Sequence, residues 1–131
     1  CQCGLNSYQI EFSDRKVRSF VINNIQRNYD DLTLAFRFAV TDALKINPLK
    51  YKTNLCFGFD GKHLIFYYMM GDVRFQSSHI ESMCESVRHN LGIDNSIDIA
   101  FINGWRDNQF KAMRMFVPTG DEIENYFSGK T

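Results

Sequence analysis

The side chains best suited to catalysis gather between positions 79 and 89. This stretch holds His79, Glu81, Cys84, Glu85 and His89, and a paired histidine is what activates a cysteine thiol as a nucleophile. Cys84 is five residues from each histidine, so in a helix each histidine lies about 140° around the axis from it. The cluster therefore fails as a Cys–His pair or a metal site within one helix. A small enzyme that uses Cys84 is our third-ranked hypothesis.

Other catalytic signatures are missing from the sequence. It has no phosphate-binding P-loop, no dinucleotide-binding glycine pattern, and no CxxC or HExxH motif. Glu81, Glu85 and His89 share one helix face, which is typical of a solvated face with i,i+4 pairs. We therefore predict no catalytic residues, no metal site and no cofactor.

Two of the four cysteines suggest a disulfide. Cys56 lies in a predicted strand and Cys84 in a predicted helix, and a helix packed on the sheet would bring them within reach. A Cys56–Cys84 bridge would close a loop of nearly 30 residues and stabilise the fold by roughly 3–4 kcal/mol. The alternative is two buried thiols in a reducing compartment.

The first residue suggests a lipid anchor. A chain that begins with Cys1 resembles a bacterial lipoprotein after signal-peptide removal, in which that cysteine carries the lipid. Residues 1–7 would then be a tether, and residues 8–131 a single domain. The alternative is an arbitrary fragment boundary. A lipid on Cys1 would be the only attachment to a membrane, and it favours a periplasm-facing location at the outer membrane.

Composition favours a partner protein over a nucleic acid. The 131 residues carry a formal net charge of zero, so no electrostatic footprint for nucleic acid or an anionic membrane is expected. Aromatic residues make up 15% of the chain, and aromatic and methionine side chains form adaptable binding surfaces. The candidates for such a surface are Tyr67, Met69, Trp105, Met113 and Met115. The alternative is that they fill the core.

Residues 53–70 predict the β-hairpin around which the fold is organised. Asp60-Gly61 suits a two-residue type I′ turn, which would pair Phe59 with Lys62 and Phe57 with Leu64. One face then carries the main apolar set, Leu55, Phe57, Leu64, Phe66, Tyr68 and Met70. The other face carries Cys56 and Ile65, so a Cys56–Cys84 bridge requires the helix that contains Cys84 to cover that second face.

Three helices are expected before and after this hairpin. An apolar stripe with three- and four-residue spacing predicts a helix over residues 13–29. Residues 31–46 fit both a strand, by alternation, and a helix, by four-residue spacing, and we favour a well-buried helix that ends before Pro48. Ser77 or Ser78 is expected to cap a third helix, with a stripe that includes Met83 and Val87, and the helix ends at Gly92.

The remaining segments complete an α+β domain. A short edge strand is expected at residues 8–12, strands at 96–102 and 109–117 would form a second hairpin, and residues 120–127 would form a short helix. Two hairpins joined by a helix predict a mainly antiparallel sheet of four or five strands with helices packed on it.

This order of elements resembles small bacterial lipoproteins of the α/β pilotin type. The resemblance covers residues 44–117: NPLKYKTNLCFGFDGKHLIFYYMM, a helix that holds Cys84, then SIDIAFINGW and a return strand. Such proteins are anchored to the outer membrane and accompany secretin subunits. The chain departs from them in two ways: its last strand has no cysteine to pair with Cys84, and it carries a further strand and helix before residue 30.

These observations predict a non-enzymatic, periplasm-facing lipoprotein that binds a protein partner as a secretion-system accessory. The alternative is an immunity or inhibitor protein that blocks a toxin or enzyme. The two differ in their complexes: the first would capture a short peptide of a membrane-protein subunit, and the second would bind a soluble enzyme one to one.

Overall fold

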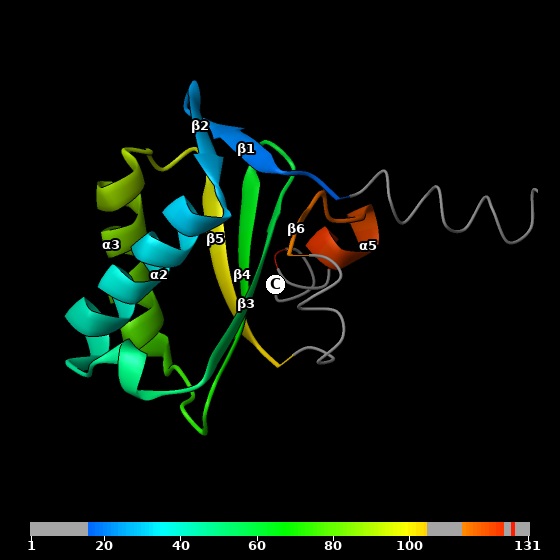
Figure 1. Cartoon of the computed structure of the whole chain (residues 1–131). Helices are drawn as coiled ribbons and strands as arrows, with labels where there is room; N and C mark the ends of the chain where they lie inside the picture. The colour runs from blue at the N-terminus through cyan, green and yellow to red at the C-terminus, as the bar shows by residue number, and fades with distance from the viewer. Residues whose placement is uncertain (1–15, 105–113, 125–126, 128–131) are drawn as a thin grey trace, which may run out of the picture.

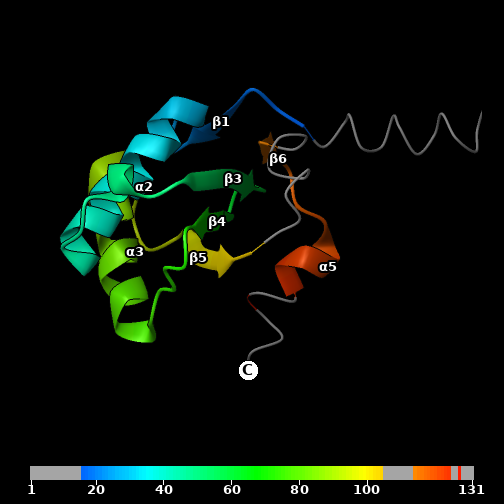
Figure 2. The same ribbon diagram turned by 60° about the horizontal axis from the view of Figure 1, so that its bottom comes forward.

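The structure is a computed structural model that describes residues 16–104, 114–124 and 127. Its main sheet has the strand order β5-β4-β3-β6, with two long helices on one face and a short helix on the other (Figures 1 and 2). These elements are β3 (Thr53–Phe59), β4 (His63–Met70), β5 (Asp98–Asn103), β6 (Met115–Phe116), α2 (Tyr29–Leu44), α3 (Ser77–Leu91) and α5 (Gly120–Ile123). The predicted α+β class is confirmed.

The main sheet is mixed, so the prediction of a mainly antiparallel sheet is wrong. β3 and β4 form the expected antiparallel hairpin, but β5 runs parallel to β4 and β6 parallel to β3. The predicted hairpin between residues 96–102 and 109–117 therefore does not form, since β5 and β6 occupy opposite edges of the sheet. Residues 105–113 lie outside the described part of the chain.

The hairpin of β3 and β4 is confirmed at the centre of the sheet, with a register that differs from the predicted one. Phe59 pairs with Leu64 and Phe57 with Phe66, so the loop has four residues instead of two. The cause is Asp60, whose Oδ1 accepts hydrogen bonds from the backbone N–H groups of Lys62 and His63 at 2.9 and 2.7 Å. The register shifts by two, so every side chain keeps its predicted face.

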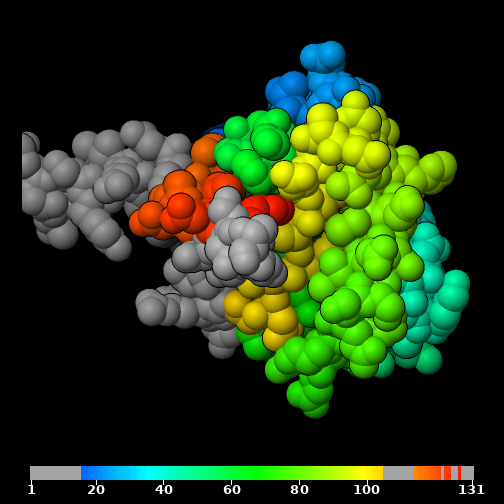
Figure 3. All heavy atoms as spheres, turned by 180° about the vertical axis from the view of Figure 1, so that it is seen from behind, coloured from blue at the N-terminus to red at the C-terminus, as the bar shows by residue number. Residues whose placement is uncertain are grey.

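Each face of the sheet has its own apolar cluster. The first-face cluster lies between the sheet and helices α2 and α3. It includes Phe57 and Phe66 from the sheet and Phe36 from α2, which are completely buried. The second face holds Cys56, Ile65, Tyr67 and Phe116, against which the C-terminal residues Ile123 and Phe127 pack. Figure 3 shows this C-terminal part of the chain, in orange, beside β5 in yellow.

Gly58 lets β6 close against the second face. A Cβ at this position would lie 3.2 Å from Cζ of Phe116, which is tighter than an ordinary van der Waals contact. The glycine therefore makes room for the ring where β6 pairs with β3.

The helix predicted over residues 13–29 is wrong within the described residues. Strands β1 (Ser19–Ile22) and β2 (Ile25–Asn28) form a separate two-stranded sheet there. Asn23 and Asn24 have φ values of 56° and 67°, which a right-handed helix cannot contain but a type I′ turn requires. Phe20 and Ile22 from this hairpin enter the first-face cluster. The predicted edge strand at residues 8–12 lies outside the described residues.

The helix favoured over residues 31–46 is confirmed as α2. Its N-terminus has a reciprocal capping box: Oδ1 of Asn28 accepts from the N–H of Asp31, and Oδ2 of Asp31 accepts from the N–H of Asn28, both at 2.9 Å. Lys45 ends the helix in a left-handed conformation with φ of 60°. The alanines Ala35 and Ala39 are buried in the helix layer, where α2 and α3 lie side by side (Figure 1).

The third predicted helix is also confirmed, although its N-cap is Gln76 and not Ser77 or Ser78. α3 buries Met83, Val87 and Leu91, and Gly92 ends it with φ of 65°, as expected for a glycine C-cap. α5 forms the start of the terminal helix predicted for residues 120–127. Glu124 and Phe127 have π-helical conformation, and residues 125 and 126 lie outside the described part of the chain. Among the described helices, none is long and apolar enough to cross a membrane.

Candidate functional site

The predicted Cys56–Cys84 disulfide does not form. Cys56 belongs to the second-face cluster, whereas α3 packs on the first face and places Cys84 against the other cluster. The sheet therefore separates the two side chains, and no disulfide joins them. Without this disulfide, the two cysteines no longer favour an oxidising compartment over a reducing one.

Cys84 has the properties of a structural thiol. It is half-buried, and its Sγ lies 3.8 Å from the carbonyl oxygen of Ile99. Burial raises the pKa of the thiol, although the charge of Arg88 acts in the opposite direction. Because nucleophilic cysteines depend on a lowered pKa and an accessible sulfur, the structure does not favour the hypothesis of an enzyme that uses Cys84.

The three predicted partner-binding residues that the structure describes do not form one surface. Tyr67 and Met115 are buried, on the second and first faces respectively, and Met69 is half-buried beside the second-face cluster. Trp105 and Met113 lie outside the described residues, as does Cys1. The lipid on Cys1 and the outer-membrane location stay predictions, which mass spectrometry of the native protein would test.

A different apolar surface lies on the outside of α2 and on the turn that follows it. Leu34 and Phe38 are 51% and 46% exposed, and they adjoin each other one helical turn apart. The turn contains the short 3-10 helix η1 (Pro48–Lys50), in which Leu49 is 69% exposed, and Tyr51 follows it. We call Leu34, Phe38, Leu49 and Tyr51 the α2–η1 surface. Leu34 and Phe38 lie on the outer side of α2 and Leu49 and Tyr51 on the turn after it, and groups of exposed apolar side chains are typical of binding sites.

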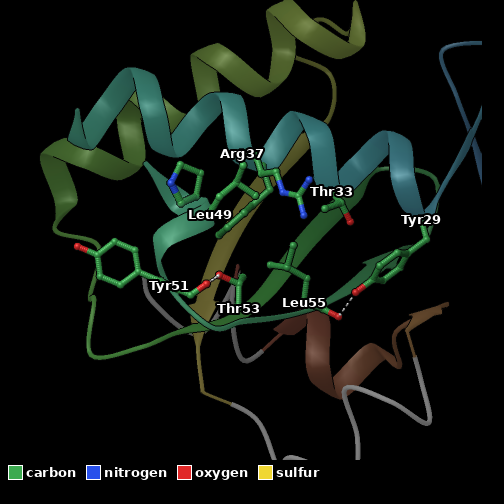
Figure 4. Close-up of a pocket in the computed structure, with 9 residues that line it drawn as sticks. Tyr29, Thr33, Arg37, Leu49, Tyr51, Thr53 and Leu55 are labelled. Carbon is green, nitrogen blue, oxygen red and sulfur yellow. Dashed lines mark hydrogen bonds between the residues drawn. The ribbon is translucent and has the colours of Figure 1, made fainter. Parts of the chain in front are cut away.

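A hollow of about 230 Å³ lies along this surface, between α2, η1 and β3. Tyr29, Thr33 and Arg37 follow one another along α2 above β3, and Leu49 and Tyr51 come from the turn (Figure 4). These α2 residues recur every four positions, so they share one side of the helix. Arg37 therefore stands between the exposed residues of α2 and those of the turn.

A second hollow of about 350 Å³ lies on the other side of Tyr29. It is lined by the residues that lead into β1, by the N-terminal end of α2 and by Arg114 and Met115. The guanidinium carbon of Arg114 lies 4.0 Å from the centre of the Tyr29 ring, in a cation–π contact. Because Tyr29 lines both hollows, we call them together the Tyr29 groove.

Tyr29 itself is firmly held. Its hydroxyl donates a 2.8 Å hydrogen bond to the carbonyl oxygen of Leu55, and its ring packs 5.1 Å from that of Phe57. Burial raises the pKa of Tyr29, while the charge of Arg114 opposes that shift. The phenol is therefore neutral at physiological pH, and it provides a fixed platform under the Arg114 guanidinium.

A polar cluster at the β3–β4 turn has a structural role. Nδ1 of His63 lies 3.1 Å from Oδ2 of Asp60, and Nε2 lies 3.8 Å from Oδ2 of Asp98. The His63 ring also packs against Phe127 in a tilted arrangement, with the ring centres 4.8 Å apart. These contacts join the β3–β4 turn, the start of β5 and the C-terminal residues.

The known proteins give no guide to this site. Comparisons with protein-family models, with curated proteins and with solved structures found no match to this chain. The site must therefore be interpreted from its own geometry.

The sequence contains only part of the signal for this site. Leu34 and Phe38 fall outside the buried stripe of α2, and Leu49 stands between Pro48 and Lys50 in a turn, so both features are visible in the sequence. Arg114 is remote from Tyr29 in sequence, and only the parallel pairing of β6 with β3 brings the two together.

Proposed function

We propose that this protein is a non-enzymatic binding module that captures a segment of a partner protein on the α2–η1 surface and in the hollow beside it. The observation that carries the proposal is the exposure of Leu49 and Tyr51 at that hollow, together with that of Leu34 and Phe38 on the outer side of α2. Binding hot spots are enriched in aromatic residues and arginine that line small pockets, and Tyr29, Tyr51 and Arg37 line this one.

The shape of the site favours a peptide segment over a folded partner. A hollow of about 230 Å³ accommodates a few side chains, whereas complexes between folded proteins usually bury about 800 Å² on each partner. Capture of a short peptide is what the pilotin-type resemblance implies. The inhibitor alternative, which calls for a one-to-one complex with a soluble enzyme, has no comparable support.

Selection of peptides from a random library on the full chain tests this proposal. We expect recovered peptides to lose about tenfold in affinity on Leu49→Ser and on Phe38→Ser, since each change removes an exposed apolar contact. Val21→Ser is the matched control, because Val21 is 66% exposed on β1, outside the α2–η1 surface.

NMR titration of the wild-type protein should place the largest shift changes at residues 29–38 and 48–55. Recovery of no peptide, or equal affinity for all three variants and the wild type, would contradict the proposal.

A further inference from the structure

We propose that the Tyr29 groove recognises an acidic segment in extended conformation, with two carboxylates four positions apart. This inference rests on the proposed function and names the chemistry of the captured segment. It depends on the charges and the spacing of the groove rather than on the apolar residues used above.

The charge of the groove differs from that of the molecule. The whole chain has a formal net charge of zero. Among the described residues, one carboxylate, that of Asp30, and four cations line the two hollows, the cations being Lys16, Arg18, Arg37 and Arg114. Among the residues that the structure describes, no ion pair joins any of these four to a carboxylate. Exposed Lys50 and Lys52 flank Tyr51 and add to the same field. The groove therefore attracts anions.

Arg114 is arranged to bind a carboxylate. Its guanidinium rests on the Tyr29 ring, and the hydroxyl of that tyrosine is fixed by Leu55. The guanidinium also makes a side-chain hydrogen bond with Tyr29. Its five N–H donors leave others at its edge for a carboxylate, and a guanidinium can bind both oxygens of one carboxylate. Because the platform is held in place, little conformational freedom is lost on binding.

Arg37 provides the second contact and sets the spacing. It follows Tyr29 by eight residues on α2, which places it about 12 Å further along the helix axis. An extended chain rises about 3.3 Å per residue and its side chains alternate between two faces, so carboxylates four positions apart lie on one face and span about 13 Å. Leu49 and Leu55 line the hollow between them, so an apolar residue between the two acids would be accommodated.

The test uses three labelled peptides and the full chain, with fluorescence anisotropy as the measurement. The first contains Glu-Thr-Leu-Thr-Glu, the second replaces both acids as Gln-Thr-Leu-Thr-Gln, and the third places the acids side by side as Glu-Glu-Thr-Leu-Thr. We expect the first to bind at least tenfold more tightly than the other two, and to lose most of that advantage at high salt, which screens exposed charges.

Variants assign the contacts. Arg37→Gln and Arg114→Gln should each weaken binding of the first peptide about tenfold, the usual effect of losing a charge-assisted hydrogen bond. Lys62→Gln is the matched control, since it removes an exposed cation from the β3–β4 turn, away from the groove. Thermal unfolding of each variant shows whether it remains folded.

Several outcomes would overturn the inference. Equal affinity for the glutamate and glutamine peptides, no effect of either arginine change, or no binding up to millimolar peptide would each do so. Tighter binding of a single-stranded oligonucleotide of equal charge would indicate a nucleic-acid site instead. A dimer in sedimentation that Arg114→Gln dissociates would indicate a second copy as the occupant.

The inference can also fail while the proposed function stands. In that case library peptides would still bind with sensitivity to Leu49→Ser, but without dependence on Arg37 or Arg114.

Discussion

Tyr29 links three parts of the molecule through one side chain. It starts α2, its hydroxyl bonds to β3 at Leu55, and its ring carries the guanidinium of Arg114, which leads into β6. No other described residue lines both hollows. A change at Tyr29 would therefore affect folding and binding together, and for this reason the tests above use Arg37 and Arg114.

Asp60 makes the stability of the β3–β4 turn dependent on pH. Burial acts to raise the pKa of its carboxyl group, but hydrogen bonds from the N–H groups of His63 and Lys62 and from the His63 ring outweigh it, so the pKa lies below its ordinary value of 3.8. A carboxylate with a lowered folded-state pKa stabilises the fold above the unfolded-state pKa, and that stability disappears as the pH falls through the folded-state value.

We therefore expect wild type to exceed Asp60→Asn in free energy of unfolding at about pH 5, with a gap that narrows below about pH 3.8, the ordinary value for this group. Urea unfolding at a series of pH values measures the gap. Asp72→Asn is the control, because Asp72 is exposed and has no side-chain hydrogen bond among the described contacts. A gap that stays constant or widens as the pH falls would be inconsistent with this account of Asp60.

Asp60 also shows a limit of sequence analysis at the residue scale. Asp60-Gly61 correctly predicts a turn, and Gly61 indeed has φ of 105°. The length of the turn depends on which N–H groups the aspartate side chain accepts, and an aspartate can bond to its own backbone two residues on in several kinds of turn. The location was therefore predictable and the register was not.

At the scale of elements, the β1–β2 hairpin is attached to the end of α3. Nη2 of Arg27 donates to the carbonyl oxygen of Leu91, and Nδ2 of Asn23 donates to that of Gly92, both at 2.7 Å. The last carbonyl groups of a helix have no partner within it, and a cation near them also interacts favourably with the helix dipole. The two side chains therefore hold the hairpin on the helix layer.

Removal of one of these contacts should loosen the hairpin locally. For Arg27→Gln we expect backbone amide exchange in residues 19–28 to become about tenfold faster, with a global loss of about 1–2 kcal/mol, because one charge-assisted hydrogen bond is lost. Hydrogen–deuterium exchange with mass spectrometry measures the first effect and urea unfolding the second. Arg18→Gln serves as the comparison, and equal exchange in both variants would argue against the role of Arg27.

The elements that the sequence predicts well are those whose local signals agree. For α3, the apolar stripe, the helical spacing and Gly92 all favour the same structure. For residues 17–29, apolar spacing suggests a helix, but Asn23-Asn24 between β-branched residues is a hairpin signal that spacing alone overlooks. β6 has only two residues and pairs with a strand far away in the sequence, so no local pattern identifies its partner.

At the scale of the whole molecule, both apolar clusters rest on the same two central strands. β3 and β4 contribute Phe57 and Phe66 to the first face, and Cys56 and Ile65 to the second. Loss of packing on either face should therefore destabilise the whole fold, as expected of a single cooperative domain.

Phe116→Ala tests this coupling. Phe116 is completely buried on the second face, so its truncation should cost about 3–5 kcal/mol and lower the unfolding temperature by about 10–20 °C. Because both clusters rest on the same sheet, we expect the helical circular dichroism signal of α2 and α3 to disappear in a single transition, with its midpoint lowered by the same amount. Val117→Ala, at a 40% exposed neighbour, should have little effect. A helix signal that keeps its wild-type midpoint would show that the faces unfold independently.

The candidate site also depends on the arrangement of the whole molecule, and for that reason the sequence did not predict it. Tyr67 and Met115 were suitable by residue type, but the sheet buries them. The Tyr29 groove instead combines residues from the approach to β1, from α2, from the turn after it and from Arg114. Only the complete tertiary arrangement brings these segments together.

The two faces of the sheet are completed at different times during synthesis. The helices that cover the first face precede residue 92, whereas the described side chains that cover the second face come from Phe116 onwards, with Ile123 and Phe127. A ribosome can therefore have released the helix layer while Cys56, Ile65 and Tyr67 still lack this cover. In that interval the nascent chain presents an apolar sheet surface of the kind that chaperones bind and that aggregates form from.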